Sequence, residues 1–125
     1  MSEKGLKYTK EHEWVRVEDD IATIGITDYA QGELGDVVYV ELPDVGAQVE
    51  QMQSFGVIEA VKTVADLYAP VSGEIVEVNG LITSEPGLVN TDPYGEGWFI
   101  KIKISNESEL EELLTYDAYT ELTKG

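Results

Sequence analysis

The sequence predicts a small, mainly β domain, either a sandwich or a barrel, with little helix. Short runs rich in Val, Ile and aromatic residues recur along the 125 residues. Segments rich in Gly, Pro, Asn and Asp separate these runs, and such residues relieve strain in turns. Apolar residues make up 42% of the chain, enough for one modest core. We therefore expect a single domain over residues 1–125, with a β core spanning roughly 13–104.

The expected elements follow in chain order. EWVRVE and IATIGIT form the first two strands, and Asp19 and Asp20 between them predict a hairpin turn. A helix of about two turns comes next, with Thr27 as its N-cap and Gly35 as its stop. The segment 106–123 begins with polar residues and continues with leucines at helical spacing, which predicts one or two short helices. The remaining strand-like runs are VVYVEL, SFGVIEAV, ADLYAPV, EIVEVN and GWFIKIKI.

An internal repeat indicates that the domain has two quasi-symmetric halves. GDVVYV from Gly35 and GEIVEV from Gly73 share Gly, Val and Val at the same offsets. The runs that begin at Gly56 and Gly97 continue the similarity after a slightly longer loop. Two copies of one β unit can pack with pseudo-twofold symmetry, each covering the apolar face of the other.

Composition excludes several classes of function. The formal charge of −17 opposes binding to nucleic acid or to anionic membranes, since both depend on basic residues. The chain has no cysteine, so it has neither a disulfide nor a thiol nucleophile. The opening residues lack a secretory signal and no run of apolar residues is long enough to span a bilayer. We expect a cytoplasmic protein, with a mature organelle form as the alternative.

Lys62 is the most unusual residue of the chain. It is the only basic residue between Arg16 and Lys101, an interval that contains sixteen carboxylates. A hairpin turning at residues 61–63 would place it at a tip. An ordinary surface lysine is one interpretation, and a Schiff-base amine is opposed by Glu59 and Asp66, which would favour the charged form. The third interpretation is that Lys62 is an attachment site for a prosthetic group, because a hairpin tip is accessible to a modifying enzyme and the lysine side chain is long.

Other chemistry has weaker support. His12 is the single histidine, and the adjacent Glu11 and Glu13 alternate across a strand, so no metal site is expected. The nucleophile elbow of hydrolases and phosphate-binding loops are missing from the sequence. Abundant acids leave a two-carboxylate hydrolase open by motif, but so short a chain offers little room for a substrate cleft.

The stretch EAVKTVADLYAPVSGEIVEVN resembles the lipoyl-attachment region of the glycine cleavage H-protein family. KYTKEHEWV, ATIGITDYAQGELGDVVYVELPDVG and LVNTDPYGEGWFIKIK match the family's order and spacing, so the resemblance covers nearly the whole chain. It implies a flattened β barrel of two similar halves, a lipoyl-domain-like barrel-sandwich hybrid with short peripheral helices and a C-terminal helix. Biotin carriers place Met on both sides of their lysine, whereas Val61 and Thr63 stand here.

The resemblance implies a carrier and not an enzyme. Lipoate amide-linked to Lys62 would accept the aminomethyl group of glycine at a decarboxylase, the P-protein. It would pass the group to an aminomethyltransferase, the T-protein, and be reoxidised by dihydrolipoamide dehydrogenase, the L-protein. A monomer is expected. Two alternatives remain open: a lipoate relay or other lipoyl carrier, and an interaction module whose lysine is never modified.

The resemblance also suggests roles for three acids. Glu59 and Asp66 would assist recognition by the lipoate-attaching enzyme, weighed evenly against simple solvated acids. Glu13 is the first candidate for docking the loaded arm and Asp66 the second, because an amine-bearing cargo favours carboxylates. An ordinary strand-surface acid is the slightly favoured interpretation of Glu13. Relatives often have His at the position of Tyr29, so no docking role is assigned there.

Overall fold

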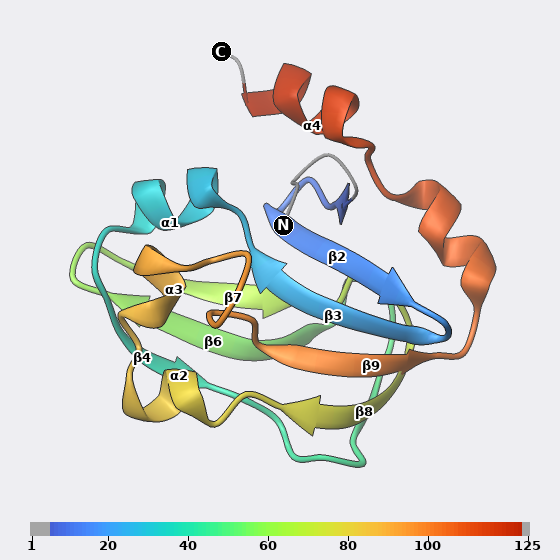
Figure 1. Ribbon diagram of the computed structural model, residues 1–125, viewed down its shortest axis with the longest axis horizontal. Helices are drawn as coiled ribbons and strands as arrows, with labels where there is room; N and C mark the ends of the chain where they lie inside the picture. Colours follow the sequence, from blue (N-terminus) through green and yellow to red (C-terminus); the bar gives the residue numbers. More distant parts are fainter. Residues whose placement is uncertain (1–5, 124–125) are drawn as a thin grey trace.

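The computed structural model describes residues 6–123, which form two layers of antiparallel β-sheet with short helices around them (Figure 1). The strands are β1 (Lys7–Tyr8), β2 (Glu13–Glu18), β3 (Ile21–Ile26), β4 (Val37–Glu41), β5 (Gln48–Val49), β6 (Ser54–Ala60), β7 (Val64–Tyr68), β8 (Gly73–Val78) and β9 (Ile100–Ile104). The helices are α1 (Asp28–Leu34), α2 (Leu81–Ser84), α3 (Leu88–Thr91), the 3-10 helix η2 (Glu107–Glu112) and α4 (Tyr116–Thr123).

The sheets are unequal in size. The larger has six strands in the order β1-β2-β3-β9-β8-β5, and the smaller has three in the order β4-β6-β7. Across residues 6–123 they do not close into one barrel, so the sandwich and not the barrel is the observed architecture. The predicted mainly β fold with short helices and a helical C-terminal segment is confirmed.

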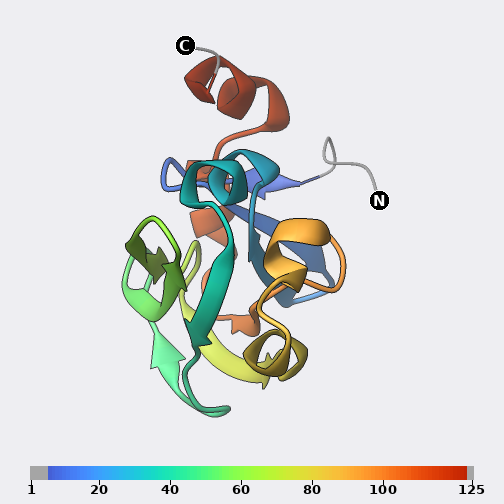
Figure 2. The same cartoon turned by 90° about the vertical axis from the view of Figure 1, so that its left-hand side faces the viewer.

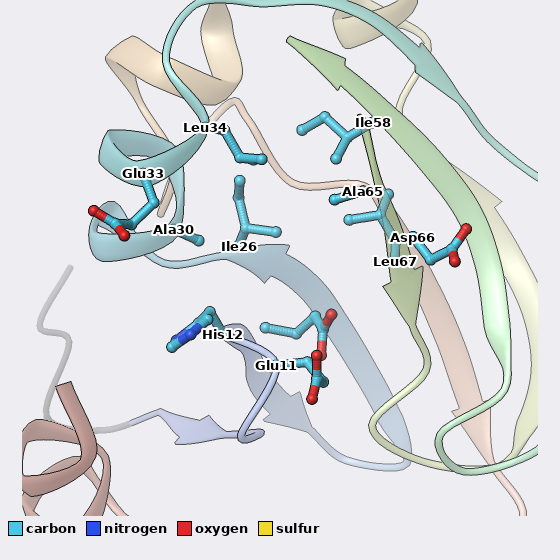
Figure 3. A pocket seen from close by; sticks show the side chains of 11 residues that line it. Glu11, His12, Ile26, Ala30, Glu33, Leu34, Ile58, Ala65, Asp66 and Leu67 are labelled. Carbon is cyan, nitrogen blue, oxygen red and sulfur yellow. The ribbon is translucent and has the colours of Figure 1, made fainter. Parts of the chain in front are cut away.

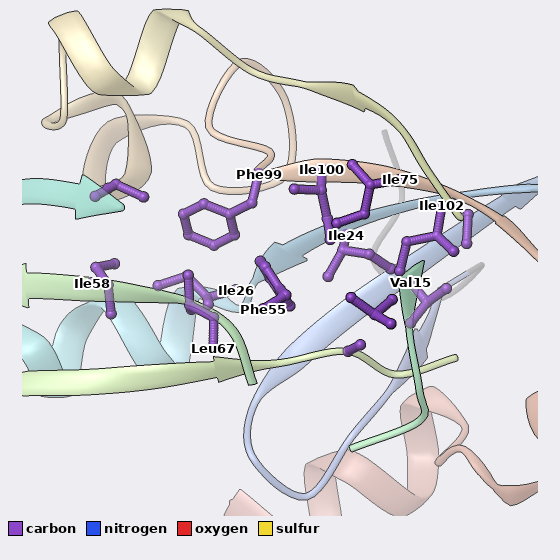
Figure 4. Packing of buried hydrophobic residues seen from close by; sticks show 14 of the residues in the cluster. Val15, Ile24, Ile26, Phe55, Ile58, Leu67, Ile75, Phe99, Ile100 and Ile102 are labelled. Carbon is purple, nitrogen blue, oxygen red and sulfur yellow. The ribbon is translucent and has the colours of Figure 1, made fainter. Parts of the chain in front are cut away.

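One hydrophobic core fills the space between the two sheets (Figure 4). Ile58 and Leu67 enter it from the smaller sheet, and Ile24 and Ile100 enter it from the larger. All four side chains are at most 1% exposed. The alternation of inward and outward residues along each strand therefore fixes which side chains of the β6–β7 hairpin remain outside.

The internal repeat corresponds to equivalent strand pairs. β4 pairs with β6, and β8 pairs with β9, each antiparallel. The register of the first pair shifts between Val37 and Tyr39, and that of the second shifts between Ile75 and Glu77. These positions are equivalent in GDVVYV and GEIVEV, so both copies of the unit carry a β-bulge at the same place.

Most expected elements occur where the sequence predicts them, and the differences are short. Thr27 caps α1 through a hydrogen bond from the Ala30 N–H, and the helix ends at Gly35. The one-turn helices α2 and α3 were not predicted, because four residues are too few to show a helical period. The two-residue strands β1 and β5 give no alternating pattern for the same reason.

The two ends of the described chain are joined at the β1 edge of the larger sheet. Tyr8 and Leu114 exchange backbone hydrogen bonds of 2.9 and 2.7 Å. The ring of Tyr8 stacks on that of Tyr119 with centroids 4.6 Å apart, and both pack in a second buried cluster with Trp14. The last helix is thereby fixed to the first strand. No helix within residues 6–123 has the length and apolar character needed to cross a membrane.

Candidate functional site

Lys62 lies at the apex of the β6–β7 hairpin, as the sequence predicts. The turn is closed by a 2.8 Å hydrogen bond from the Ala60 N–H to the Thr63 carbonyl, and Val61, Lys62 and Thr63 are all exposed. Figure 2, viewed from the left-hand side of Figure 1, shows this hairpin beside the start of β4. Within residues 6–123, Lys62 forms no ion pair and no side-chain hydrogen bond. Its amine is therefore presented to solvent.

The stem of Lys62 lies over the residue that ends α1. A Cβ atom built on Gly35 would be 3.3 Å from Cδ and Cε of the lysine, so the absence of a side chain at Gly35 leaves room for the stem. Gly35 also has a φ of 81°, a conformation that glycine adopts without strain. The Val61 N–H donates to the Asp36 carbonyl at 2.9 Å. The apex is thus supported by the segment 35–37 that joins α1 to β4.

Glu59 and Asp66 lie on the outer face of the hairpin. Glu59 is opposite Val64 in the register and Asp66 is opposite Val57, while Ile58 and Leu67 face the core. Glu59 is half-buried and Asp66 is exposed, and neither pairs with Lys62. Their position beside the apex leaves both carboxylates accessible to a visiting protein. A role in recognition by the lipoate-attaching enzyme stays a prediction.

A cavity of about 200 Å³ lies between the N-terminal loop, α1 and the inner edge of the hairpin (Figure 3). Its apolar wall includes Ile26, Leu34 and Ile58, and its acids are Glu11, Glu13, Glu33 and Asp66. Leu34 immediately precedes Gly35, so one wall of the cavity begins next to the lysine stem. In Figure 3 the carboxylate of Asp66 turns away from the cavity toward the outer face.

Glu13 is buried, so the interpretation of this residue as an ordinary strand-surface acid is wrong. Glu13, at the start of β2, is 1% exposed because its side chain points inward, between the loop after β1 and strand β7. One carboxyl oxygen accepts a hydrogen bond from the Thr9 hydroxyl, and the other accepts one of 3.2 Å from the Tyr68 N–H. Burial raises the pKa of Glu13 to about 7, despite these two hydrogen bonds, which lower the pKa.

His12 forms the rim of the cavity next to Glu13. Its Nδ1 lies 2.8 Å from the Tyr119 hydroxyl, which is also 2.7 Å from the Thr27 hydroxyl. The ring of Tyr29 lies 4.9 Å from that of His12. Burial lowers the pKa of His12. Among residues 6–123, no group of three or more His, Asp or Glu side chains is arranged to hold a metal ion.

Sequence reasoning missed two parts of this site. Thr9 is the hydroxyl partner of Glu13, and its place four residues earlier in KYTKEHEW gives no signal of that contact. The sequence predicts Gly35 as the end of α1 and the start of the repeated unit, but it does not show that Gly35 lies beneath Lys62. The second function of Gly35 depends on packing between segments 27 residues apart in sequence, which local patterns do not show.

The site combines one exposed, unpaired lysine at a hydrogen-bonded hairpin apex with an acid-lined apolar cavity beside it. This combination is typical of carrier proteins that hold a covalently attached arm. The chain matches the glycine cleavage H-protein family over residues 6–125. It therefore belongs to the glycine cleavage H-protein family, the lipoyl carriers of the glycine cleavage system.

Individual relatives agree with this assignment. The chain is 58% identical to a glycine cleavage system H protein of Symbiobacterium thermophilum, over 95% of this chain and 93% of that protein. It is 57% identical to the corresponding protein of Carboxydothermus hydrogenoformans, over 95% of this chain and 92% of the other. A crystal structure of a glycine cleavage system H protein from Mycobacterium marinum superposes with a TM-score of 0.92 at 38% identity. That likeness covers 99% of this chain and all of the other.

Proposed function

We propose that Lys62 is the residue that carries lipoate, through an amide bond to its side-chain nitrogen. The observation that supports this most directly is the placement of a single unpaired amine at an exposed hairpin apex. A modifying enzyme can reach that nitrogen without unfolding the carrier. The other lysines between β2 and the C-terminal segment, Lys101 and Lys103, lie along β9 within the larger sheet and not at a turn.

The residues around the apex fit such an arm. Gly35 leaves a channel for the lysine stem, and the apolar wall that begins at Leu34 suits the aliphatic part of a lipoyl group. When bound, lipoate supplies the disulfide and dithiol chemistry by which the aminomethyl group of glycine is carried. The protein contributes the anchor, the docking surface and exclusion of water.

Glu13 is proposed as the group that binds the amine end of the loaded arm. Its carboxyl oxygens are held by Thr9 and the Tyr68 N–H, so they cannot rotate freely away from the cavity. A protonated amine brought into this apolar pocket would stabilise the ionised carboxylate. Asp66 is the second candidate: its backbone lies at the cavity wall, while its carboxylate would act only on an arm that crosses the rim.

The partners follow from this carriage. They are the glycine decarboxylase P-protein, the aminomethyltransferase T-protein, the dihydrolipoamide dehydrogenase L-protein and the lipoate-attaching enzyme. The carrier itself catalyses no step and acts as a cytoplasmic monomer. With a formal charge of −17, its favoured partners present basic surfaces around their active-site entrances.

Intact-mass measurement tests the attachment. Protein produced with lipoate in a competent host should gain the mass of one lipoyl group, located by peptide mapping at Lys62. Lys62→Arg keeps the positive charge but should gain nothing. Lys101→Arg is the matched control and should be modified like the unchanged protein. A wholly unmodified chain would contradict the proposal and favour an interaction module.

Glycine–bicarbonate exchange with a P-protein tests the pathway. Exchange should require the modified form and should be lost in Lys62→Arg. A lipoylated chain that fails to support exchange with its cognate P-protein would favour the lipoate-relay alternative.

A further inference from the structure

The segment 35–37 beneath Lys62 is held from the opposite side by one side chain, that of Asn90 in α3. The Asn90 Oδ1 accepts a 2.8 Å hydrogen bond from the Val37 N–H. Its Nδ2 donates to the Gly35 carbonyl at 2.9 Å and to the Gln31 Oε1 at 3.0 Å. The amide thus uses its acceptor and both of its donor hydrogens.

These contacts place Asp36 between Asn90 on one side and the hairpin apex on the other. Asn90 binds the carbonyl before Asp36 and the N–H after it, while the Asp36 carbonyl accepts the hydrogen bond from the Val61 N–H at the hairpin apex. The stem of Lys62 lies on Gly35, at the start of the same segment. The path from Asn90 to the lysine therefore passes through a single peptide segment, with a hydrogen bond or close contact at every step.

We propose that Asn90 is a positioning residue for the modification of Lys62: it holds the segment 35–37 in place, and that segment orients the hairpin apex and the lysine stem. The inference rests on the proposed attachment of lipoate at Lys62. Its physical basis is that the hairpin apex is already ordered before the attaching enzyme binds. An apex that is already fixed costs the attaching enzyme less conformational entropy than one that must be fixed in the complex.

The alternative is that Asn90 only adds to the overall stability of the fold. The two can be distinguished, because a purely structural contact would lower global stability without acting selectively on the apex. Asn90→Ala removes all three hydrogen bonds. Asn90→Asp keeps the shape and the acceptor for the Val37 N–H, but it replaces the donor nitrogen with a second acceptor oxygen that faces the Gly35 and Gln31 oxygens. It remains informative if the alanine variant folds poorly. Asn106→Ala is the matched control, because Asn106 also bonds through its side chain, to Ser108 at the start of η2.

Amide hydrogen exchange measured by NMR on the unmodified protein is the first readout. In both Asn90 variants the Val61 N–H should exchange about tenfold faster, as expected when hydrogen bonds that support it are lost, whereas amides of β8 and β9 should keep their rates. Asn106→Ala should leave the Val61 rate unchanged. An unchanged Val61 rate in Asn90→Ala, or an equal acceleration throughout the sheets, would overturn the proposal.

The second readout is the rate of lipoylation by a purified lipoate-attaching enzyme, followed by intact mass well below the unfolding temperature of each variant. The kcat/KM for the carrier should fall about tenfold in both Asn90 variants, and remain at the unchanged level in Asn106→Ala. Equal rates in all variants would refute a positioning role. If the unchanged protein is never modified, the proposed function fails, and the exchange measurement alone then decides whether Asn90 orders the apex.

Discussion

The buried carboxyl of Glu13 should make the stability of the protein fall as the pH rises. The folded pKa is about 7, above the ordinary value of 4.5, so the folded state holds this proton more tightly than the unfolded chain. The stability from this group is fully present below pH 4.5 and is lost as the pH rises through 7. At 1.36 kcal/mol per pKa unit, the loss is about 1 kcal/mol at pH 5 and about 3 kcal/mol at pH 8.

Glu13→Gln replaces the titrating group with a neutral one of similar shape. Urea unfolding, followed by tryptophan fluorescence at pH 5, 6, 7 and 8, should show the unchanged protein losing about 2 kcal/mol relative to this variant across the range. Glu18→Gln, at the exposed end of the same strand, is the control and should follow the unchanged protein. Parallel stability curves for Glu13→Gln and the unchanged protein would refute the argument that burial raises this pKa.

Three further outcomes are expected. Gly35→Ala should lower the free energy of unfolding by about 1 kcal/mol, because alanine is strained at the φ of 81° found at this position. It should also slow lipoylation, because the new Cβ meets the Lys62 stem. A normal modification rate would contradict the contact between residue 35 and the lysine. Thr27→Ala removes the α1 cap and a partner of Tyr119, so urea unfolding should show a loss of about 2 kcal/mol, while Thr27→Ser should lose little. If the charge of −17 steers the encounter, raising the salt concentration from about 0.05 to 0.5 M should slow aminomethyl transfer to the partner enzymes about tenfold. Rates that do not depend on salt would exclude electrostatic steering.

The sequence was most informative where a local residue pattern and the packed structure favour the same strand or turn. Runs rich in β-branched and aromatic residues, bounded by turn-forming residues, predicted β2, β3 and β6. The hairpin apex at Lys62 followed from two β-prone runs of similar length on either side of it. The GDVVYV and GEIVEV repeat predicted equivalent units, and the structure adds a shared bulge that no residue type in either segment signals.

Burial of Glu13 could not be read from its own segment. Glu13, Trp14 and Val15 are all buried, so both faces of β2 are covered at that end, which the residues EWVRVE do not reveal. The burial of Glu13 depends on Thr9 in the loop that follows β1 and on Tyr68 of β7, which belongs to the other sheet and meets Glu13 only after the two sheets pack. The same holds for Asn90, whose three hydrogen bonds all go to residues 53 to 59 positions away. Contacts of this kind carry no local sequence signal.

The joining of the two chain ends has a consequence for synthesis on the ribosome. Tyr8 is paired with Leu114, and His12 and Thr27 meet at the Tyr119 hydroxyl, so the loop that covers Glu13 is held by residues that follow β9 in the chain. A nascent chain released only as far as β9 would have every strand described within residues 6–123, but the loop over Glu13 would lack its contacts with Leu114 and Tyr119. We expect the cavity to reach its final form only after Leu114 and α4 have left the ribosome and packed on β1.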